Sequence, residues 1–276
     1  MIERENPRVY VVVRNRNEAA HLERLIRALE LQTWRPGLVL VDNESTDDSV
    51  AVASRYGARI VKISRDEFSF GRAINVGVEA APAEFIVLLS SHSLPLTSTF
   101  IEDCLRPFDD PDVAAVKCLK LIVCERWMNP KVLRGPVNWD DIRVQDLLEN
   151  NGSVFRKSVW SKFPFDETLE ASEDRLWSFQ VLNAGYAIAH SAALYKYCHK
   201  DRFWARLRRF TREHTALHRM GARRNNPYPV SRVLADVFYR LPREYLATTL
   251  YTMLRFLAFQ TVSWKARRKG RLGSVR

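Results

Sequence analysis

The sequence contains few cysteines and few glycines. Of its 276 residues, 4 are Cys and 10 are Gly. The cysteines form no Cys-x-x-Cys pair and have no histidines at zinc-ligand spacing; they are Cys104, Cys118, Cys124 and Cys198. This spacing argues against a structural zinc site or a disulfide framework, and it favours a reducing compartment.

Several functional motifs and segments are also missing. Neither GxGxxG nor GxxxxGK[ST] occurs, which argues against a dinucleotide enzyme and a P-loop NTPase. A nucleotidyltransferase is disfavoured for a similar reason, because the chain has no Gly-rich basic loop near its N-terminus. The opening residues, MIERENPRVYVVV, lack a basic region followed by an apolar run, so we expect no signal peptide.

The positive charge is concentrated at one end. Apolar residues make up 46% and charged residues 27% of the chain, as in globular proteins. Residues 1–199 hold 24 Lys/Arg and 28 Asp/Glu, whereas residues 200–276 hold 19 and 4. This shift predicts a domain boundary near residue 200, between one domain at 1–200 and a basic amphipathic helical region at 201–276.

Short apolar runs alternate with helical patterns in the first part of the chain. Strands are expected at Val9–Val13, Leu38–Val41, Ala58–Ile63 and Glu84–Leu89. Helical patterns follow the first three, around residues 22–29, 49–56 and 72–80. This alternation predicts βαβ units, and hence an α/β fold with a mostly parallel sheet.

Polar residues follow three of these strands. They are Arg14, Asn17 and Glu18; Asp42, Asn43 and Ser45; and Ser90 and His92. Each group alone fits loop solvation or helix capping. Ligands bind at the carboxyl ends of the strands in such sheets, so three groups on one edge favour a polar cleft suited to a nucleotide.

An acidic pair, Glu173-Asp174, precedes a later helical pattern that ends near Gly185. One interpretation is a charge pair on a surface helix, stabilised by the helix dipole. The other is that Asp174 projects into the cleft as a general base.

Four blocks of the sequence resemble family 2 inverting glycosyltransferases, which have the GT-A fold. They are VVVRNRNEAAHLERLIRALELQT, LVLVDNESTDDSV, SRDEFSFGRAINVGVEAAPAEFIVLLSSHSLP and NNGSVFRKSVWSKFPFDETLEASEDRLWSFQVLNAGY. They occur in the family's order over about residues 8–200. The similarity is strongest to the rhamnosyltransferase-like members that build surface polysaccharides.

The resemblance implies roles for individual residues. The nucleotide pocket would contain Arg14, Asn17, Glu18, Asp42, Asn43 and Ser45. In the Gly-Arg-x-x-Asn element, Arg72 would neutralise phosphate charge and Asn75 would lie near the donor. Without the family context, Arg72 fits a solvated helix start and Asn75 a cap or buried hydrogen-bond partner.

The sequence departs from the family at the fourth strand. Members commonly have Asp-x-Asp there, whose second carboxylate binds a divalent cation, but here Ser90-Ser91-His92 occurs. His92 is therefore a metal ligand, a direct contact of the diphosphate, or a mark of weakened metal dependence. His199 resembles a late histidine of the family and is a second candidate ligand, for Mn²⁺ or Mg²⁺.

The resemblance further implies a single displacement, with Asp174 taking the acceptor proton and Glu173 orienting it or binding the acceptor. The donor would be a UDP- or dTDP-linked sugar and the acceptor a glycan or lipid-linked glycan. QxxRW, the mark of processive synthases, is absent, so single additions are expected.

The basic region allows several interpretations. Residues 202–224 are Arg-rich with interleaved aromatics, and Tyr245–Trp264 is largely apolar around Arg255. We weigh an in-plane membrane helix, a buried appendage or oligomer contact, and a true span. A non-enzymatic protein that binds nucleic acid or membrane through these helices is the alternative function class. No nucleic-acid-binding motif supports it, and we expect a cytoplasmic enzyme bound peripherally to the inner face of the plasma membrane.

Overall fold

The structure, a computed structural model, describes residues 8–121, 131–198 and 203–222. All of them belong to one compact unit, Met1–Asn225. The expected apolar helix at Tyr245–Trp264 lies outside the described residues, as does most of the basic region. Within the described part of the chain, no helix is long and apolar enough to cross a membrane.

The described residues form a nine-stranded sheet at the centre of this unit, in the order β3-β2-β1-β4-β8-β6-β9-β5, with β7 also paired to β9. The strands are β1 (Val9–Asn15), β2 (Gly37–Asp42), β3 (Arg59–Lys62), β4 (Phe85–Ser90), β5 (Ser93–Pro95), β6 (Val113–Lys120), β7 (Val132–Arg134), β8 (Gly152–Arg156) and β9 (Ala187–Tyr197).

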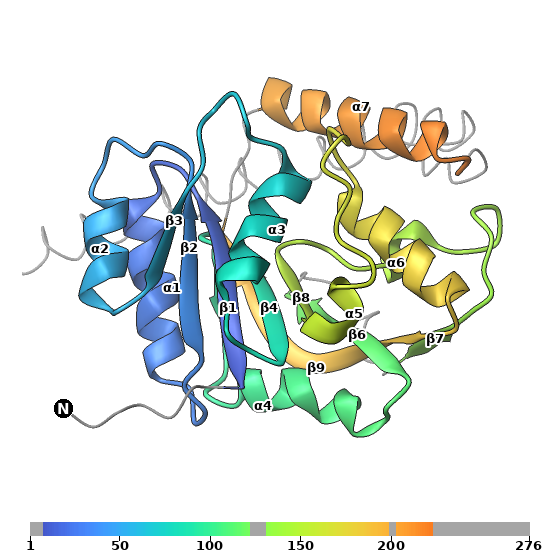
Figure 1. Ribbon diagram of the computed structural model, residues 1–276, viewed down its shortest axis with the longest axis horizontal. Helices are drawn as coiled ribbons and strands as arrows, with labels where there is room; N and C mark the ends of the chain where they lie inside the picture. Colours follow the sequence, from blue (N-terminus) through green and yellow to red (C-terminus); the bar gives the residue numbers. More distant parts are fainter. Residues whose placement is uncertain (1–7, 122–130, 199–202, 223–276) are drawn as a thin grey trace, which may run out of the picture. The chain divides into compact units, whose positions relative to one another are not determined.

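Helices cover both faces of the sheet (Figure 1). They are α1 (Ala19–Glu30), α2 (Ser49–Arg55), α3 (Phe70–Ala80), α4 (Phe100–Leu105), α5 (Lys157–Trp160), α6 (Glu173–Asn183) and α7 (Phe203–Arg219). Short 3₁₀ turns occur at Arg106–Asp109 and Val144–Asp146. The predicted strands and helices of the first 90 residues are confirmed, with small shifts at their ends.

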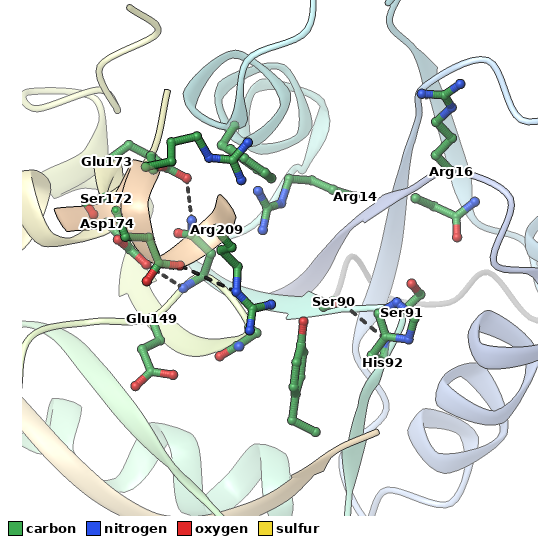
Figure 2. Close-up of a pocket in the computed structure, with 18 of the residues that line it drawn as sticks. Arg14, Arg16, Ser90, Ser91, His92, Glu149, Ser172, Glu173, Asp174 and Arg209 are labelled. Atoms are coloured by element: carbon green, nitrogen blue, oxygen red, sulfur yellow. Dashed lines mark hydrogen bonds and ion pairs between the residues drawn. The ribbon is translucent and has the colours of Figure 1, made fainter. Parts of the chain in front are cut away.

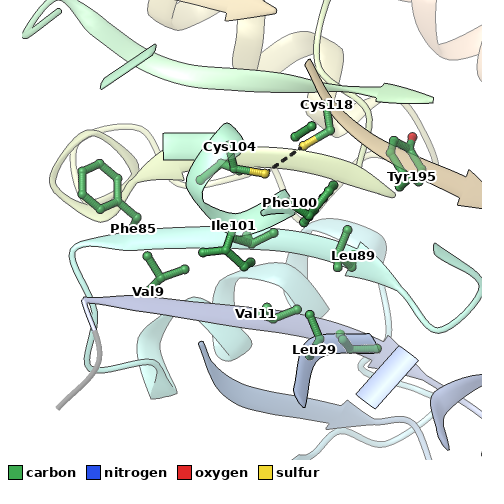
Figure 3. Packing of buried hydrophobic residues seen from close by; sticks show 14 of the residues in the cluster. Val9, Val11, Leu29, Phe85, Leu89, Phe100, Ile101, Cys104, Cys118 and Tyr195 are labelled. Atoms are coloured by element: carbon green, nitrogen blue, oxygen red, sulfur yellow. Dashed lines mark hydrogen bonds between the residues drawn. The ribbon is translucent and has the colours of Figure 1, made fainter. Parts of the chain in front are cut away.

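Alternating side chains of the strands supply two hydrophobic cores. Val9, Val11 and Val13 of β1 pack with α1, α2 and α4 on one face, as Figure 3 shows in part. Tyr10 and Val12 pack with α3, α5 and α6 on the other. Successive strand residues point to opposite faces, so an unbroken apolar run is what a strand buried on both sides requires.

The predicted mostly parallel sheet is wrong in its second half. β3, β2, β1 and β4 are parallel, and β6 is parallel to β9. However, β8 lies antiparallel between β4 and β6, and β5 and β7 pair antiparallel with β9. The sheet of the described residues is therefore mixed. Sequence periodicity identifies strands but not their direction, which tertiary pairing decides.

Candidate active site

A cavity of about 660 Å³ opens at the carboxyl ends of β1, β2 and β4. The register fixes this edge, because Asn15 of β1 lies opposite Asp42 of β2 and Arg14 lies opposite Ser90 of β4. The three predicted polar groups therefore do meet at one edge of the sheet. The predicted residues that line the cavity are Arg14, Glu18, Asn43, Ser90, His92, Glu173 and Asp174. Figure 2 labels Arg14, Ser90, His92, Glu173 and Asp174 among them.

Two of the other predicted residues hold the cavity's first two loops together. Ser45 Oγ accepts hydrogen bonds from Asn15 Nδ2 at 3.3 Å and from the Asn17 backbone N–H at 3.0 Å. Asn17 has a φ of 55° and its Oδ1 accepts from the Thr46 N–H at 2.7 Å. Asn tolerates this left-handed conformation better than most residues. Asn17 and Ser45 thus connect the loops after β1 and β2.

Three buried oxygens at this edge have no hydrogen-bond donor among the described residues. They are Asn15 Oδ1, Asp42 Oδ1 and Asn43 Oδ1. Asp42 is not among the residues that line the cavity, whereas Asn43 is. The other oxygen of Asp42 accepts from the Ser45 N–H at 3.2 Å. An unsatisfied buried acceptor costs about 1–3 kcal/mol. A ligand that brings N–H or O–H donors to this edge removes that cost.

The Gly-Arg-x-x-Asn element lies outside the cavity. Asn75 is buried: its Oδ1 accepts from Trp160 Nε1 and the Phe165 N–H, and its Nδ2 donates to Phe165 O and Glu167 Oε1. A Cβ on Gly71 would come within 2.1 Å of Asp166 O. Gly71 and Asn75 of α3 therefore contact the segment that leads to α6 and hold it in place. Arg72, which is half-exposed, pairs with Glu167 at 3.6 Å.

The carboxylates Glu173 and Asp174 begin α6 and are 1% and 9% exposed. This burial rules out the interpretation of a surface charge pair. The Asn150 and Arg175 backbone N–H groups donate to the two oxygens of Asp174 at 2.9 and 2.8 Å. Asn150 Nδ2 donates to Glu173 Oε1. Asn150, which lies outside α6, thus holds both carboxylates in place.

Burial raises the pKa of both carboxyls. It acts together with the charge of Asp174 to raise the pKa of Glu173 to about 7, against the lowering effect of Arg14. Burial also raises the pKa of Asp174, whereas Arg175 and the Asn150 N–H lower it. A carboxyl group with a pKa near the working pH accepts a proton more readily than an exposed one.

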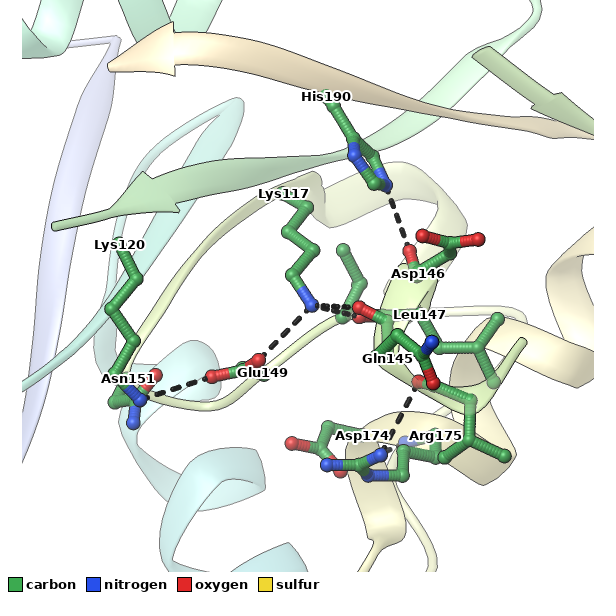
Figure 4. Close-up of polar contacts among 12 residues, drawn as sticks. Lys117, Lys120, Gln145, Asp146, Leu147, Glu149, Asn151, Asp174, Arg175 and His190 are labelled. Carbon is green, nitrogen blue, oxygen red and sulfur yellow. Dashed lines mark hydrogen bonds and ion pairs between the residues drawn. The ribbon is translucent and has the colours of Figure 1, made fainter. Parts of the chain in front are cut away.

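Residues 145–151 bring further groups to the cavity that the sequence did not single out (Figure 4). Lys117 Nζ donates to Gln145 O and Leu147 O at 2.6 and 2.8 Å and pairs with Glu149 at 3.1 Å. Burial alone would raise the pKa of Glu149, but Lys117 and Lys120 lower it to about 2. These contacts fix the backbone that carries Asn150. The quoted block NNGSVF marked the segment but not its function.

The basic helix α7 also reaches the cavity, contributing Arg209, Arg212 and Glu213. The Arg212 guanidinium lies 5.5 Å from the centre of the Phe70 ring, and the Arg14 guanidinium lies 5.0 Å from it. Leu217 and Ala222 pack against Val144 in a small hydrophobic cluster. Arg14 Nη1 is buried with no partner among the described residues. The place of these α7 side chains at the cavity was not predicted, because α7 follows the four family-like blocks in sequence.

His92 lies at the end of the cavity nearest α1. Its Nε2 is 3.3 Å from Glu18 Oε1, and its ring centre is 4.5 Å from that of His21. Glu18, His21 and His92 each offer one ligand atom, and these atoms lie within 4.8 Å of one another. His199, the other predicted metal ligand, lies outside the described residues.

Comparisons with known proteins give one curated relative and several solved structures. The O-antigen chain rhamnosyltransferase WbaN of Salmonella anatum is 27% identical over 180 residues, which are 60% of this chain and 57% of WbaN. The chain thus spans just over half the length of that relative.

The structures are similar in fold at low sequence identity. The mannosyltransferase PcManGT of Pyrobaculum calidifontis, solved with GDP-Man and Mn²⁺, has a TM-score of 0.59, 16% identity, and coverage of 93% of this chain and 83% of its own. S. aureus TarS 1-349 has a TM-score of 0.57, 17% identity, and coverage of 68% and 60%. Mycobacterium tuberculosis glucosyl-3-phosphoglycerate synthase, solved with Mn²⁺ and UDP, has a TM-score of 0.56 and 18% identity. The match covers 77% of this chain and 78% of that one.

These similarities confirm the GT-A-type α/β arrangement, whereas the basic C-terminal appendage and the division near residue 200 stay predictions. A sequence model for "Glycosyl transferase family 2" matches residues 10–153, which is more than half of the chain. The chain therefore belongs to glycosyl transferase family 2.

Proposed function

We propose that this protein is an inverting glycosyltransferase that adds one sugar from a nucleotide-diphosphate donor to a glycan or lipid-linked glycan in surface-polysaccharide synthesis. The observation that carries the proposal is the shared cavity. Buried carboxylates on α6 and the polar ends of β1, β2 and β4 line the same space, although they are far apart in sequence.

The donor side supports a nucleotide. The unsatisfied oxygens of Asn15, Asp42 and Asn43 need donors, and the N–H groups of a base or the hydroxyls of a ribose supply them. UDP- and dTDP-linked sugars are the donors proposed. A rhamnosyl donor is the first to test, because the curated relative is named as a rhamnosyltransferase.

The reaction needs a base and a stabilised leaving group. Asp174 takes the proton of the acceptor hydroxyl while that oxygen attacks the anomeric carbon, and the bond to the diphosphate breaks on the opposite face. Glu173 orients the acceptor or Asp174. Arg14 and the α7 arginines lie near enough to the cavity to stabilise the charge that develops on the diphosphate.

A divalent cation, Mn²⁺ or Mg²⁺, is compatible with this site, and the solved relatives named above include Mn²⁺ complexes. The chain's own donor set supports it: Glu18 and His92 line the cavity beside His21. A bound cation neutralises diphosphate charge.

Nucleotide binding tests the proposal directly. We expect purified protein to bind UDP or dTDP in a calorimetric panel of nucleoside diphosphates and nucleotide sugars, with and without Mn²⁺. Asp42→Ala should raise the Kd about 10- to 100-fold, the value of a hydrogen bond to a charged group. Asp48→Ala, on the same loop and exposed, serves as the control. Equal affinity in the wild type and Asp42→Ala would remove Asp42 from the donor site.

We also propose peripheral membrane association on the cytoplasmic side through the basic residues beyond α7, which suits a lipid-linked acceptor. The full-length protein should sediment with anionic phosphatidylglycerol vesicles and be released by salt, because the attraction is electrostatic. It should stay in solution with neutral phosphatidylcholine vesicles. Equal recovery with both vesicle types argues against a basic membrane contact.

A further inference from the structure

We infer that Ser172 and Asn150 form a subsite that binds a second hydroxyl group of the acceptor sugar, beside the hydroxyl that attacks. The inference rests on the proposed function and deepens it, because it names a chemical requirement of the acceptor. That acceptor is a sugar ring with a hydroxyl on the carbon next to the attacking oxygen. Ser172 and Asn150 both line the cavity that contains Asp174.

Ser172 is the N-cap residue of α6, but its side chain does not cap the helix. A capping serine usually has extended backbone angles, and its Oγ accepts a hydrogen bond from an N–H of the first turn. Ser172 instead has left-handed angles, with φ 66° and ψ 23°, which are uncommon for residues other than glycine. The Arg175 N–H, which a capping oxygen could take, donates to Asp174 Oδ1 at 2.8 Å. The helix therefore does not use the Ser172 hydroxyl.

Two oxygens of this subsite have no partner among the described residues. Ser172 is 6% exposed, and its Oγ is buried without a hydrogen bond. Asn150 Oδ1 is likewise buried without a hydrogen bond, although Asn150 Nδ2 donates to Glu173 Oε1. Most buried polar atoms in proteins have partners, and an exception costs free energy. A ligand that brings a hydroxyl group to these two oxygens removes that cost.

The subsite lies next to the proposed base. Figure 2 shows Ser172 together with Glu173 and Asp174, and the Asn150 N–H donates to Asp174 Oδ2 at 2.9 Å. A sugar ring whose attacking hydroxyl reaches Asp174 can therefore place its next hydroxyl at Ser172 and Asn150. Rotation about the Cα–Cβ bond lets Ser172 present Oγ to the bound ring. A serine Oγ can donate or accept and an amide oxygen accepts, so one hydroxyl can satisfy both.

Transfer to p-nitrophenyl glycosides tests the inference. A panel of these acceptors identifies the best one, and its two monodeoxy analogues each lack one hydroxyl next to the attacking oxygen. With the parent acceptor, Ser172→Ala should lower the acceptor kcat/KM about 3- to 10-fold, the value of one neutral hydrogen bond. With one of the deoxy analogues, the same substitution should change kcat/KM less than about 2-fold, because the hydroxyl that pairs with Ser172 is already missing. The Kd of UDP or dTDP should stay unchanged.

Melting temperatures separate this role from a structural one. Ser172→Ala removes a buried hydroxyl without a partner, and Ser172→Gly also removes the strain of a side chain at positive φ. Neither substitution should lower the melting temperature, although both should lower kcat/KM. Ser153→Ala is the matched control, because Ser153 is 1% exposed with an unpartnered Oγ but is not among the residues that line the cavity. It should leave the acceptor kcat/KM unchanged.

Three results would overturn the inference. The first is an unchanged acceptor kcat/KM in Ser172→Ala and Ser172→Gly. The second is an equal loss of kcat/KM with the parent and with both deoxy acceptors. The third is a panel that neither binds nor accepts a sugar in protein that does bind UDP or dTDP. Absence of nucleotide binding would instead contradict the proposed function, so the two failures are distinguishable.

Discussion

Asp174→Asn should lower kcat by about 10²- to 10⁴-fold, the usual contribution of general base catalysis, while the Kd of the donor nucleotide changes little. The substitution preserves size but removes the atom that accepts the proton. Asp174 accepts hydrogen bonds from the Asn150 and Arg175 N–H groups, which do not belong to the ends of β1, β2 and β4. Steady-state transfer assays and calorimetry on the same samples measure both quantities.

Glu170→Gln is the matched control, because Glu170 is an exposed carboxylate four residues earlier. It should leave kcat unchanged. In Asp174→Asn the new amide group meets two N–H donors, so the melting temperature of this variant must be compared with the wild type, and Asp174→Ser provides a smaller replacement. Turnover retained in well-folded Asp174 variants would remove this residue from the mechanism.

The pH dependence of transfer should reflect the raised pKa values of Glu173 and Asp174. Transfer should fall as pH drops below about 7, because the pKa of Glu173 is raised to about 7 and the pKa of Asp174 is raised as well. Glu173→Gln removes the repulsion between the two charges, so the acid limb should move to lower pH. The free energy of unfolding should depend on the same carboxyl group. Because the pKa of Glu173 is raised in the folded state, its protonation stabilises the fold at low pH, and this contribution is lost as pH rises from about 4.5 to 7.

Arg14→Gln should lower kcat by about 10²- to 10³-fold, the cost of losing a preorganised group that stabilises developing charge. Arg14 reaches the cavity from the end of β1, has a buried Nη1 without a partner among the described residues, and lies near both carboxylates. Its loss should also move the acid limb of the pH profile upward, since Arg14 lowers the pKa of Glu173. Single-turnover kinetics with saturating donor separate the chemical step from binding.

Two variants on α7 test whether the loss of kcat is specific to Arg14. Arg209→Gln removes a charge from the cavity lining. It should lower kcat less than Arg14→Gln does, because Arg209 also forms an ion pair with Glu213 at 3.8 Å. Arg208→Gln removes the same charge from an exposed position outside the cavity lining and should leave kcat unchanged. If Arg14→Gln lowers only the melting temperature, Arg14 supports the fold rather than the leaving group.

The polar edge of the cavity could be predicted from the sequence because it depends on local order. Unbroken apolar runs such as Val9–Val13 predict buried strands, and in parallel neighbours the residues after each strand meet at one edge. The register of Arg14 with Ser90 and of Asn15 with Asp42 confirms that reasoning. The helical pattern after Glu173 likewise placed the acidic pair at the start of α6.

Motif residues were harder to interpret from the sequence, because a short pattern does not say whether a side chain meets a ligand or the protein itself. Arg72 and Asn75 illustrate this. Asn75 satisfies its hydrogen bonds with Trp160, Phe165 and Glu167, about 90 positions away, so its part in positioning α6 was invisible in the local sequence.

The sequence by itself therefore determined the α/β class, the polar edge of the sheet and the acidic pair before α6, since each follows from periodicity or position along the chain. Only the tertiary structure decided the antiparallel direction of β8, the burial of Glu173 and Asp174, the place of α7 beside the cavity and the grouping of His21 with His92. Those features depend on contacts between residues that are far apart in the sequence, such as Arg212 with Phe70, and no local pattern encodes such distant packing.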